Sequence, residues 1–311
     1  VVAGDDAPEL LLLLPEQVVL PLPLAAARYG AGGGMDDHIG SHTSRRPGRH
    51  HTNIPIMSHH YIRFDEVRYR YPDGYEALKG VSLLIRHGEK VALLGANGAG
   101  KSTLLLHAAG LLLPTSGEVI VGGIKSTRRT MPQIRRAAGL VFQNADDQLF
   151  MPTVEEDVAF GPANMRLTQA QIDVRVAAAL AAVGATAYRR MPSHRLSGGM
   201  KKSVSIATVL AMEPSVLVMD EPTAGLDAQA RRRIVALLER FEHTMIVATH
   251  DMDMAADLCE RTIILDNGII AADGAACDIL SDNDLLQRCG LEMPCRFRHR
   301  CRLAGLSGIS V

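Results

Sequence analysis

Residues 95–103 of this 311-residue chain read Gly95-Ala-Asn-Gly-Ala-Gly100-Lys101-Ser102-Thr103. They end an apolar run over residues 90–95, which predicts a strand, and they open residues 102–111, which predict a helix. Glycines at this spacing let backbone N–H groups wrap around phosphate oxygens, and the helix N-terminus faces the same charge. We therefore expect a phosphate-binding loop in which Lys101 reaches the β- and γ-phosphates and Ser102 ligates Mg²⁺. The alternative is a glycine-rich turn that matches by chance.

A second motif, Val216-Leu-Val-Met-Asp220-Glu221, combines an apolar run with an acidic pair. Four apolar residues in a row are typical of a strand that is buried on both faces. The acidic pair would then lie at the carboxyl end of the strand, where α/β sheets bind ligands. This position predicts that Asp220 holds Mg²⁺ and that Glu221 orients and polarises an attacking water. A solvated acidic turn is the alternative.

The third motif is Leu196-Ser197-Gly198-Gly199-Met200, which directly precedes an expected helix. A hydroxyl and free backbone amides at a helix start form a second anion-binding site, although a simple helix cap is the more common reading. One chain does not need two γ-phosphate sites for one nucleotide. Two chains arranged head to tail do need them, because each chain can then complete the site of the other.

The composition excludes several classes of protein. The chain has 33 Lys and Arg against 34 Asp and Glu, and it lacks Trp, so neither its charge nor its aromatic content favours nucleic acid. All five cysteines lie near the C-terminus, which suits a reducing cytoplasm better than a disulfide framework. The most apolar run, residues 10–27, contains Glu16 and three prolines and does not predict a membrane-spanning helix.

Strands alternate with helices along the chain, which indicates an α/β fold with a mainly parallel core sheet. The stretch from about 146 to 200 shows almost no strand signal and predicts a helical insertion. Residues 1–56 predict a disordered leader, with Met57 as a candidate translation start, and residues 57–285 predict the main domain. Residues 286–311 form a tail without an assigned role. The expected strands and helices cover residues 62–65, 81–85, 118–121, 139–142, 216–220, 245–249 and 262–265 (strands), and 168–183, 198–211 and 228–241 (helices).

Together, the three motifs resemble those of the nucleotide-binding subunit of ABC transporters, over residues 61 to about 285. The resemblance implies a P-loop NTPase core, an antiparallel β subdomain and a helical signature subdomain. It also implies an enzyme that hydrolyses ATP with Mg²⁺. The Ser-Gly-Gly run resembles the family signature, which binds the γ-phosphate of the ATP held by the opposite subunit. Met200 stands where the family usually has Gln.

Further positions follow the family pattern. Tyr71 resembles the aromatic residue that stacks on adenine, with Tyr69 and Tyr75 as competitors. Gln143 resembles the glutamine that senses Mg²⁺ and links the core to the helical insertion, and His250 resembles the histidine that holds the γ-phosphate. The resemblance assigns catalysis to Lys101, Gln143, Glu221 and His250, and Mg²⁺ to Ser102, Gln143 and Asp220. It assigns nucleotide contacts to Tyr71, Gly95, Asn97, Gly98, Ala99, Gly100, Lys101, Ser102, Thr103, Ser197, Gly198, Gly199 and Asp227.

The run Val141-Phe-Gln-Asn-Ala-Asp-Asp-Gln-Leu-Phe150 resembles energy-coupling factor importers, above all the cobalt and nickel uptake ATPases. Such a resemblance implies a second ATPase subunit, identical or not, a transmembrane coupling protein and a small membrane protein that captures the substrate. It places the chain peripherally on the cytoplasmic face of the cell membrane. Vitamin uptake is the alternative cargo, and a soluble ABC ATPase without a transport role is the rival function.

Two groups of histidine and cysteine residues are candidate metal ligands, which a cobalt or nickel cargo makes relevant. Six of the twelve histidines lie between His38 and His60, and a free N-terminus at Met57 would place one of the last two at a chelating spacing. A polar leader is the simpler reading. Cys289, Cys295 and Cys301 are spaced more widely than the ligands of structural zinc sites.

Overall fold

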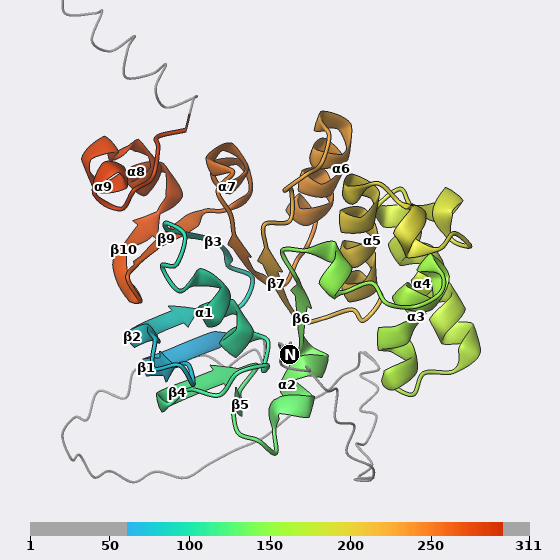
Figure 1. Ribbon diagram of the computed structural model, residues 1–311, viewed down its shortest axis with the longest axis horizontal. Coiled ribbons are helices and arrows are strands. Elements are labelled where there is room, and N and C mark those ends of the chain that lie inside the picture. Colours follow the sequence, from blue (N-terminus) through green and yellow to red (C-terminus); the bar gives the residue numbers. More distant parts are fainter. Residues whose placement is uncertain (1–60, 295–311) are drawn as a thin grey trace, which may run out of the picture. The chain divides into compact units, whose positions relative to one another are not determined.

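The computed structural model describes residues 61–294. The expected leader over residues 1–56, the candidate start at Met57, the histidine-rich stretch and the cysteines at 295 and 301 lie outside the described residues. The described chain forms two β-sheets with helices around them, and Figure 1 shows the helices α3, α4 and α5 grouped beyond the β6 edge of the larger sheet.

The larger sheet has six strands in the order β10-β9-β3-β8-β7-β6. Neighbouring strands are parallel from β9 through β3, β8 and β7 to β6, which confirms the predicted mainly parallel core. The edge strand β10 pairs antiparallel with β9. Every residue of β7 and β8 is buried, as expected for strands covered on both faces. The strands are β3 (Lys90–Leu94), β6 (Ala138–Val141), β7 (Val216–Asp220), β8 (Thr244–Ala248), β9 (Arg261–Asp266) and β10 (Ile269–Ala275).

Strand β10 was not predicted. It alternates between exposed and half-buried residues, so its hydrophobic signal is weak. The turn before it consists of Asn267 and Gly268, which have φ angles of 47° and 82°. An Asn-Gly pair with two positive φ angles is typical of a two-residue hairpin, and this signal was available in the sequence.

The smaller sheet is antiparallel and has the order β2-β1-β4-β5. Ile62 lies opposite Ile85 of β2 on one side and opposite Val121 of β4 on the other. These three side chains are fully buried, because the sheet turns one face toward α1. The strands are β1 (Ile62–Arg70), β2 (Glu76–Ile85), β4 (Ser116–Val121) and β5 (Ile124–Lys125).

Helix α1 (Lys101–Ala108) packs against both sheets through Leu104 and Leu105. The prediction that this helix runs to residue 111 was wrong. Gly110 adopts a left-handed φ of 66°, and a Cβ at this position would lie 2.8 Å from a side-chain carbon of Ile134. A glycine in this conformation just beyond the C-cap ends the helix.

Residues 142–215 contain helices and no strand. Thr153 and Thr168 form capping boxes with Glu156 and Gln171, which fix the first turns of α3 and α4. Valine and leucine side chains of the three main helices share one apolar cluster. The elements are η1 (Ala145–Asp147), α3 (Val154–Asn164), α4 (Gln169–Ala182), η2 (Thr186–Tyr188), η3 (Ser193–Arg195) and α5 (Gly198–Leu210).

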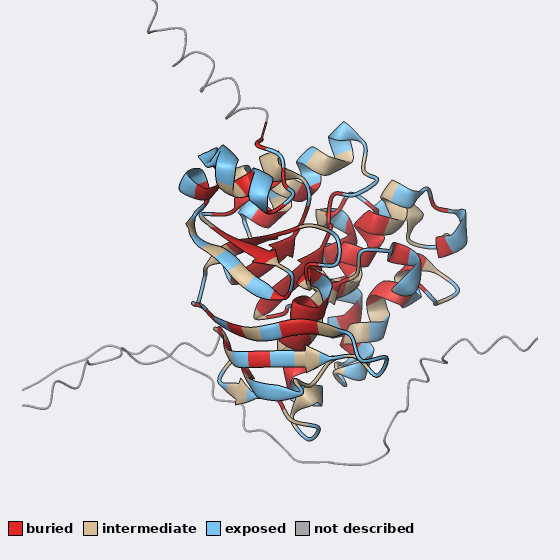
Figure 2. Ribbon diagram, turned by 60° about the vertical axis from the view of Figure 1, so that its left-hand side comes forward, coloured by how far each residue is buried: buried red, intermediate tan, exposed pale blue. Residues whose placement is uncertain are grey.

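The remaining helices cover the larger sheet and its ends: α2 (Met131–Ala137), α6 (Ala228–Glu239), α7 (Met252–Leu258), α8 (Ala276–Ser281) and α9 (Asn283–Arg288). Figure 2 shows the inner strands of this sheet buried and the outer faces of the helices exposed. Beyond α9, Cys289, Leu291 and Met293 are still buried against the core. None of the helices in the described part is both long and apolar enough to cross a bilayer.

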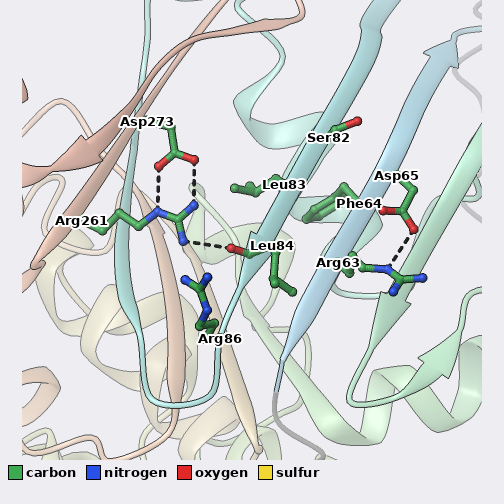
Figure 3. Close-up of a pocket in the computed structure, with 9 residues that line it drawn as sticks. All are labelled: Arg63, Phe64, Asp65, Ser82, Leu83, Leu84, Arg86, Arg261 and Asp273. Atoms are coloured by element: carbon green, nitrogen blue, oxygen red, sulfur yellow. Dashed lines mark hydrogen bonds and ion pairs between the residues drawn. The ribbon is translucent and has the colours of Figure 1, made fainter. Parts of the chain in front are cut away.

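Arg261 of β9 joins the two sheets. Its guanidinium donates two hydrogen bonds of 2.7 Å to the Asp273 carboxylate of β10 and one of 2.9 Å to the Leu84 carbonyl of β2 (Figure 3). The Glu89 carboxylate accepts another at 2.8 Å, and the carboxylates of Asp273 and Glu89 raise the pKa of Arg261. Arg261 lines the surface pocket of Figure 3. Because its guanidinium is already bonded to groups of the protein, we interpret this pocket as a structural contact between the two sheets.

Candidate functional site

The phosphate loop connects β3 to α1, as the sequence predicts. Lys101 is nearly buried, and its ammonium donates hydrogen bonds to the carbonyls of Gly95 at 2.7 Å and Ala96 at 2.9 Å. Burial lowers the pKa of Lys101, while the carboxylates of Glu221 and Asp220 oppose this shift. The lysine therefore bridges its own loop and faces the acidic pair.

The loop has no room for larger residues at Gly100. This glycine has a φ of 103°, and a Cβ on it would lie 2.6 Å from the Ala77 carbonyl oxygen. An L side chain would meet both backbone strain and a collision. The glycine keeps the start of α1 open toward the loop.

Ser102 and Asp220 come together at the carboxyl ends of β3 and β7. The Ser102 hydroxyl donates a hydrogen bond of 2.6 Å to the Asp220 carboxylate. The two residues are 118 positions apart in the chain, so only the parallel sheet brings them together. Hydroxyl and carboxylate oxygens are the hard ligands that Mg²⁺ prefers, and this pair fits such an ion.

Glu221 lies next to this pair in a strained backbone conformation, with a φ of 48°. Its N–H donates to the Ala248 carbonyl at 2.9 Å, and its Oε2 accepts a hydrogen bond of 3.2 Å from Thr249. Its buried Oε1 has no hydrogen-bond partner among the described residues, and His250 Nε2 lies 3.4 Å from it. Backbone strain and an unpartnered carboxylate oxygen are typical of a functional site.

Tyrosine side chains gather beside the loop. The Tyr71 hydroxyl is hydrogen-bonded to Thr103 of the loop at 3.0 Å, and its ring meets Tyr69 edge to face. Tyr75 is stacked on Tyr71 with ring centroids 6.5 Å apart, and its hydroxyl donates to the Gly98 carbonyl at 3.0 Å. Of the two competing tyrosines, Tyr75 is exposed beside the loop. Tyr69 is half-buried, and this burial raises its pKa.

Within residues 61–294, the side chains of Gln143, Ser197 and Asp227 form no hydrogen bond to this loop. The Gln143 side chain is exposed and makes no hydrogen bond within residues 61–294. Ser197 is also exposed and caps its own helix by accepting from the Met200 N–H at 3.3 Å. Asp227 caps α6 in the same way, through the amides of Gln229 and Ala230.

Two residues that sequence reasoning missed lie close to this site. Lys202, only 2% exposed, donates to the carbonyls of Phe142, Gln143 and Asp220. Burial lowers the pKa of Lys202 to about 8, against the opposing effect of Asp220 and Glu221. A lysine on an amphipathic helix normally points to solvent, so no sequence signal distinguishes it from its neighbours.

The second missed residue is Asp251, which follows His250. Its carboxylate accepts two hydrogen bonds from Arg231 of α6, at 2.7 and 2.9 Å. Burial alone would raise the pKa of Asp251, but the hydrogen bonds from Arg231 and the Met254 amide lower it below its ordinary value. This ion pair joins the helix after Asp227 to the segment after His250.

Comparisons with known proteins agree with this geometry. A sequence model of the ABC transporter family matches residues 78–224. An ABC transporter ATP-binding protein of Geobacter sulfurreducens is 55% identical over 238 residues, which cover 76% of this chain and 96% of that protein. The energy-coupling factor transporter ATP-binding protein EcfA of Methanocaldococcus jannaschii is 44% identical over 238 residues, with 75% and 85% covered.

Solved structures give the same answer. The cbiO1 protein of Clostridium perfringens, part of the ABC transporter complex cbiONQ, aligns with a TM-score of 0.65 and 37% identity over 80% of this chain and 98% of that one. A dimeric ATP-binding cassette in a post-hydrolysis state, bound to ADP and phosphate, aligns with a TM-score of 0.64 and 30% identity over 69% and 98%. The predicted resemblance to energy-coupling factor ATPases is confirmed. The chain belongs to the ATP-binding proteins of ABC transporters, and it is an ATPase.

Proposed function

We propose that this ATPase energises a membrane importer of the energy-coupling factor type, with cobalt or nickel ions as the cargo. The observation that carries the proposal is that one loop, residues 142–153, connects the acidic pair of the site to an exposed aromatic side chain. At one end lies Gln143, whose backbone is bonded to Lys202 beside the acidic pair. At the other end lies Phe150, an exposed aromatic side chain.

Hydrolysis uses the residues at the carboxyl ends of β3, β7 and β8. ATP lies on the phosphate loop and on Tyr71, with Asn97, Gly98 and Ala99 contributing to the loop. Ser102 and Asp220 would hold Mg²⁺, with Gln143 as a further ligand, and the ion would supply positive charge beside the phosphates. Glu221 polarises the attacking water through its unpartnered oxygen, and His250 holds the γ-phosphate.

A second ATPase subunit, either another copy of this chain or a related one, completes each site. Ser197 and Gly198 are exposed, and neither Ser197 nor Asp227 bonds the phosphate loop of its own chain within the described residues. In a head-to-tail dimer, Ser197, Gly198 and Gly199 contact the γ-phosphate held by the partner, and Asp227 lies in the interface. The likeness to a dimeric cassette supports this arrangement.

The coupling surface is formed by Phe150 and Phe160, which are 59% and 40% exposed and meet edge to face at 4.9 Å. Hydrogen bonds to the backbone beneath this surface hold Phe150 in its exposed position. The buried carboxylate of Asp157 accepts hydrogen bonds of 2.9 Å from the amides of Phe150 and Met151. We assign this surface to an apolar segment of the transmembrane coupling protein, which would hold the ATPase peripherally on the cytoplasmic face of the membrane.

The proposed cargo is supported by likeness alone, since an ATPase of this type is not expected to touch the substrate. The run Val141–Phe150 resembles cobalt and nickel uptake ATPases, and cbiO1 aligns over most of the chain. Vitamin uptake stays the alternative cargo, captured by a different membrane protein. The absence of a basic surplus, with 33 Lys and Arg against 34 Asp and Glu, gives no support for a nucleic-acid partner.

Glu221→Gln tests the proposal, because it keeps the shape of the side chain and removes its ability to accept a proton. With Mg-ATP it should trap an ATP-bound dimer, and it should capture the membrane partners from detergent-solubilised native membranes. A coupling protein together with a metal-capturing membrane protein supports cobalt or nickel import. A vitamin-binding membrane protein keeps the mechanism and replaces the cargo. Recovery of ribosomes or DNA-bound proteins, without a membrane partner, contradicts the transport function.

A further inference from the structure

Lys202 is a buried lysine whose ammonium, within residues 61–294, is held by backbone carbonyls alone. Its Nζ donates hydrogen bonds of 2.8 Å to Phe142, 3.0 Å to Gln143 and 3.2 Å to Asp220. An ammonium has three N–H donors, so all of them are used. The side chain is only 2% exposed, and no carboxylate forms a salt bridge with it within the described residues.

A charge buried in this way is costly unless its hydrogen bonds are kept. If Lys202 only filled space, methionine or leucine would fill it at a lower cost in free energy, because neither side chain carries a charge. The position of the charge is therefore informative. It lies where three segments meet: the signature helix α5, the start of the loop after β6 and the end of β7.

The bond to Asp220 acts on the peptide unit that connects Asp220 to Glu221. Lys202 binds the C=O of this peptide unit, and the Ala248 carbonyl accepts its N–H at 2.9 Å. Both ends of the peptide plane are thus fixed, directly before a residue with a φ of 48°. An L residue in the left-handed region persists only where its surroundings hold it there. Lys202 is part of what holds Glu221.

The bonds to Phe142 and Gln143 fix the other side of the site. Helix α5 holds the same loop a second time, because Gln148 donates to the Ser205 carbonyl and to the Thr208 hydroxyl, both at 2.7 Å. The Gln148 side chain also accepts from the Phe142 N–H at 3.0 Å. The loop is therefore bonded to α5 at residues 142–143 and again at residue 148, and Lys202 extends this contact to β7.

We propose that Lys202 is a positioning residue for hydrolysis, which fixes the Gln143 backbone and the Asp220–Glu221 peptide relative to the signature helix. Docking of that helix would then set the geometry of the Glu221 carboxylate. The residue does not touch ATP or the attacking water. The inference rests on the ATPase activity of the chain and is independent of the identity of the transported substrate.

Three variants of the full chain test the inference. Lys202→Met keeps the length of the side chain and removes all donors, and Lys202→Arg keeps charge and donors. Lys201→Met is the matched control, because the neighbouring lysine forms an ion pair of 2.5 Å with the largely exposed Asp146. The measurements are kcat and KM for ATP, and amide hydrogen exchange of residues 141–148 and 219–223 in the nucleotide-free chain.

For Lys202→Met we expect kcat to fall on the order of 100-fold, the size of effect caused by misplacing a reacting group by about 1 Å. KM should stay near the wild-type value, because the phosphate loop is not altered. Exchange should accelerate in both segments. Lys202→Arg should restore part of kcat, and Lys201→Met should keep it. If Lys202→Met does not fold, Lys202→Gln, which keeps an N–H donor, takes its place.

The inference is overturned if kcat of Lys202→Met equals that of Lys201→Met, or if the loss lies entirely in KM. It is also overturned if exchange of residues 219–223 is unchanged, or if Lys202→Arg is no better than Lys202→Met. The exchange measurement needs no ATP and no membrane partner. A failure of the proposed transport function would therefore leave this test intact.

Discussion

Removal of the Asp157 carboxylate should destabilise the protein measurably. This side chain is 3% exposed and accepts hydrogen bonds from the amides of Phe150 and Met151 and from the Ser193 hydroxyl. A hydrogen bond to a charged group contributes about 1.5–3 kcal/mol, and the two loop amides can recover part of this from water. For Asp157→Ala we therefore expect a loss of about 3 kcal/mol in the free energy of unfolding.

Urea and thermal unfolding of the purified chain measure this loss. For a domain of this size, about 3 kcal/mol corresponds to a Tm lower by about 6–12 °C. Asp173→Ala is the control, because Asp173 is exposed on α4 and accepts one hydrogen bond from Gln169. The reasoning is refuted if Asp157→Ala costs no more than Asp173→Ala. Asp157→Asn, which keeps one acceptor oxygen, should lie between the two.

Three further outcomes follow from the structure. Tyr71→Ala should raise KM for ATP by about 5- to 150-fold, the equivalent of about 1–3 kcal/mol of base stacking, and an unchanged KM would reject Tyr71 as the adenine contact. The folded-state pKa of Asp251 is lowered, so its pair with Arg231 stabilises the fold above about pH 4. This stabilisation is lost as the pH falls through the folded-state pKa. In urea unfolding at acid pH, the difference in stability between wild type and Arg231→Gln should therefore vanish. Phe150→Ala should lower recovery of the membrane partner in the pull-down, whereas Val174→Ala, which removes another exposed apolar side chain, should not.

The parts of the fold that could be predicted from the sequence are those with a local cause. The phosphate loop needs glycines at fixed spacings, and β7 needs a run of apolar residues, so both are visible in a short window. The acidic pair could be placed near the loop because carboxyl ends of parallel strands share one edge of a sheet. The end of α1 and strand β10 were missed, although Gly110 and Asn267-Gly268 carry usable turn signals.

The supporting residues of the site could not be predicted. Lys202 bonds carbonyls of residues 60, 59 and 18 positions away, and Arg231 pairs with a carboxylate 20 positions away. Backbone carbonyls carry no sequence signature, so a lysine that binds them looks like any solvated lysine. The predicted trans contacts of Ser197 and Asp227 stay predictions, because a single chain cannot form them.

The burial of α5 has a mechanical consequence. The thirteen residues of α5 form a helix about 20 Å long. Residues 202–207 are buried without a break, so the middle of the helix is packed on all sides. We expect a helix packed in this way to resist bending. We therefore expect a displacement of its exposed N-terminus, Gly198, to shift the helix as a rigid body. We expect the flexibility to lie instead in residues 142–153 and 183–197, which contain short 3₁₀ turns and no α-helix.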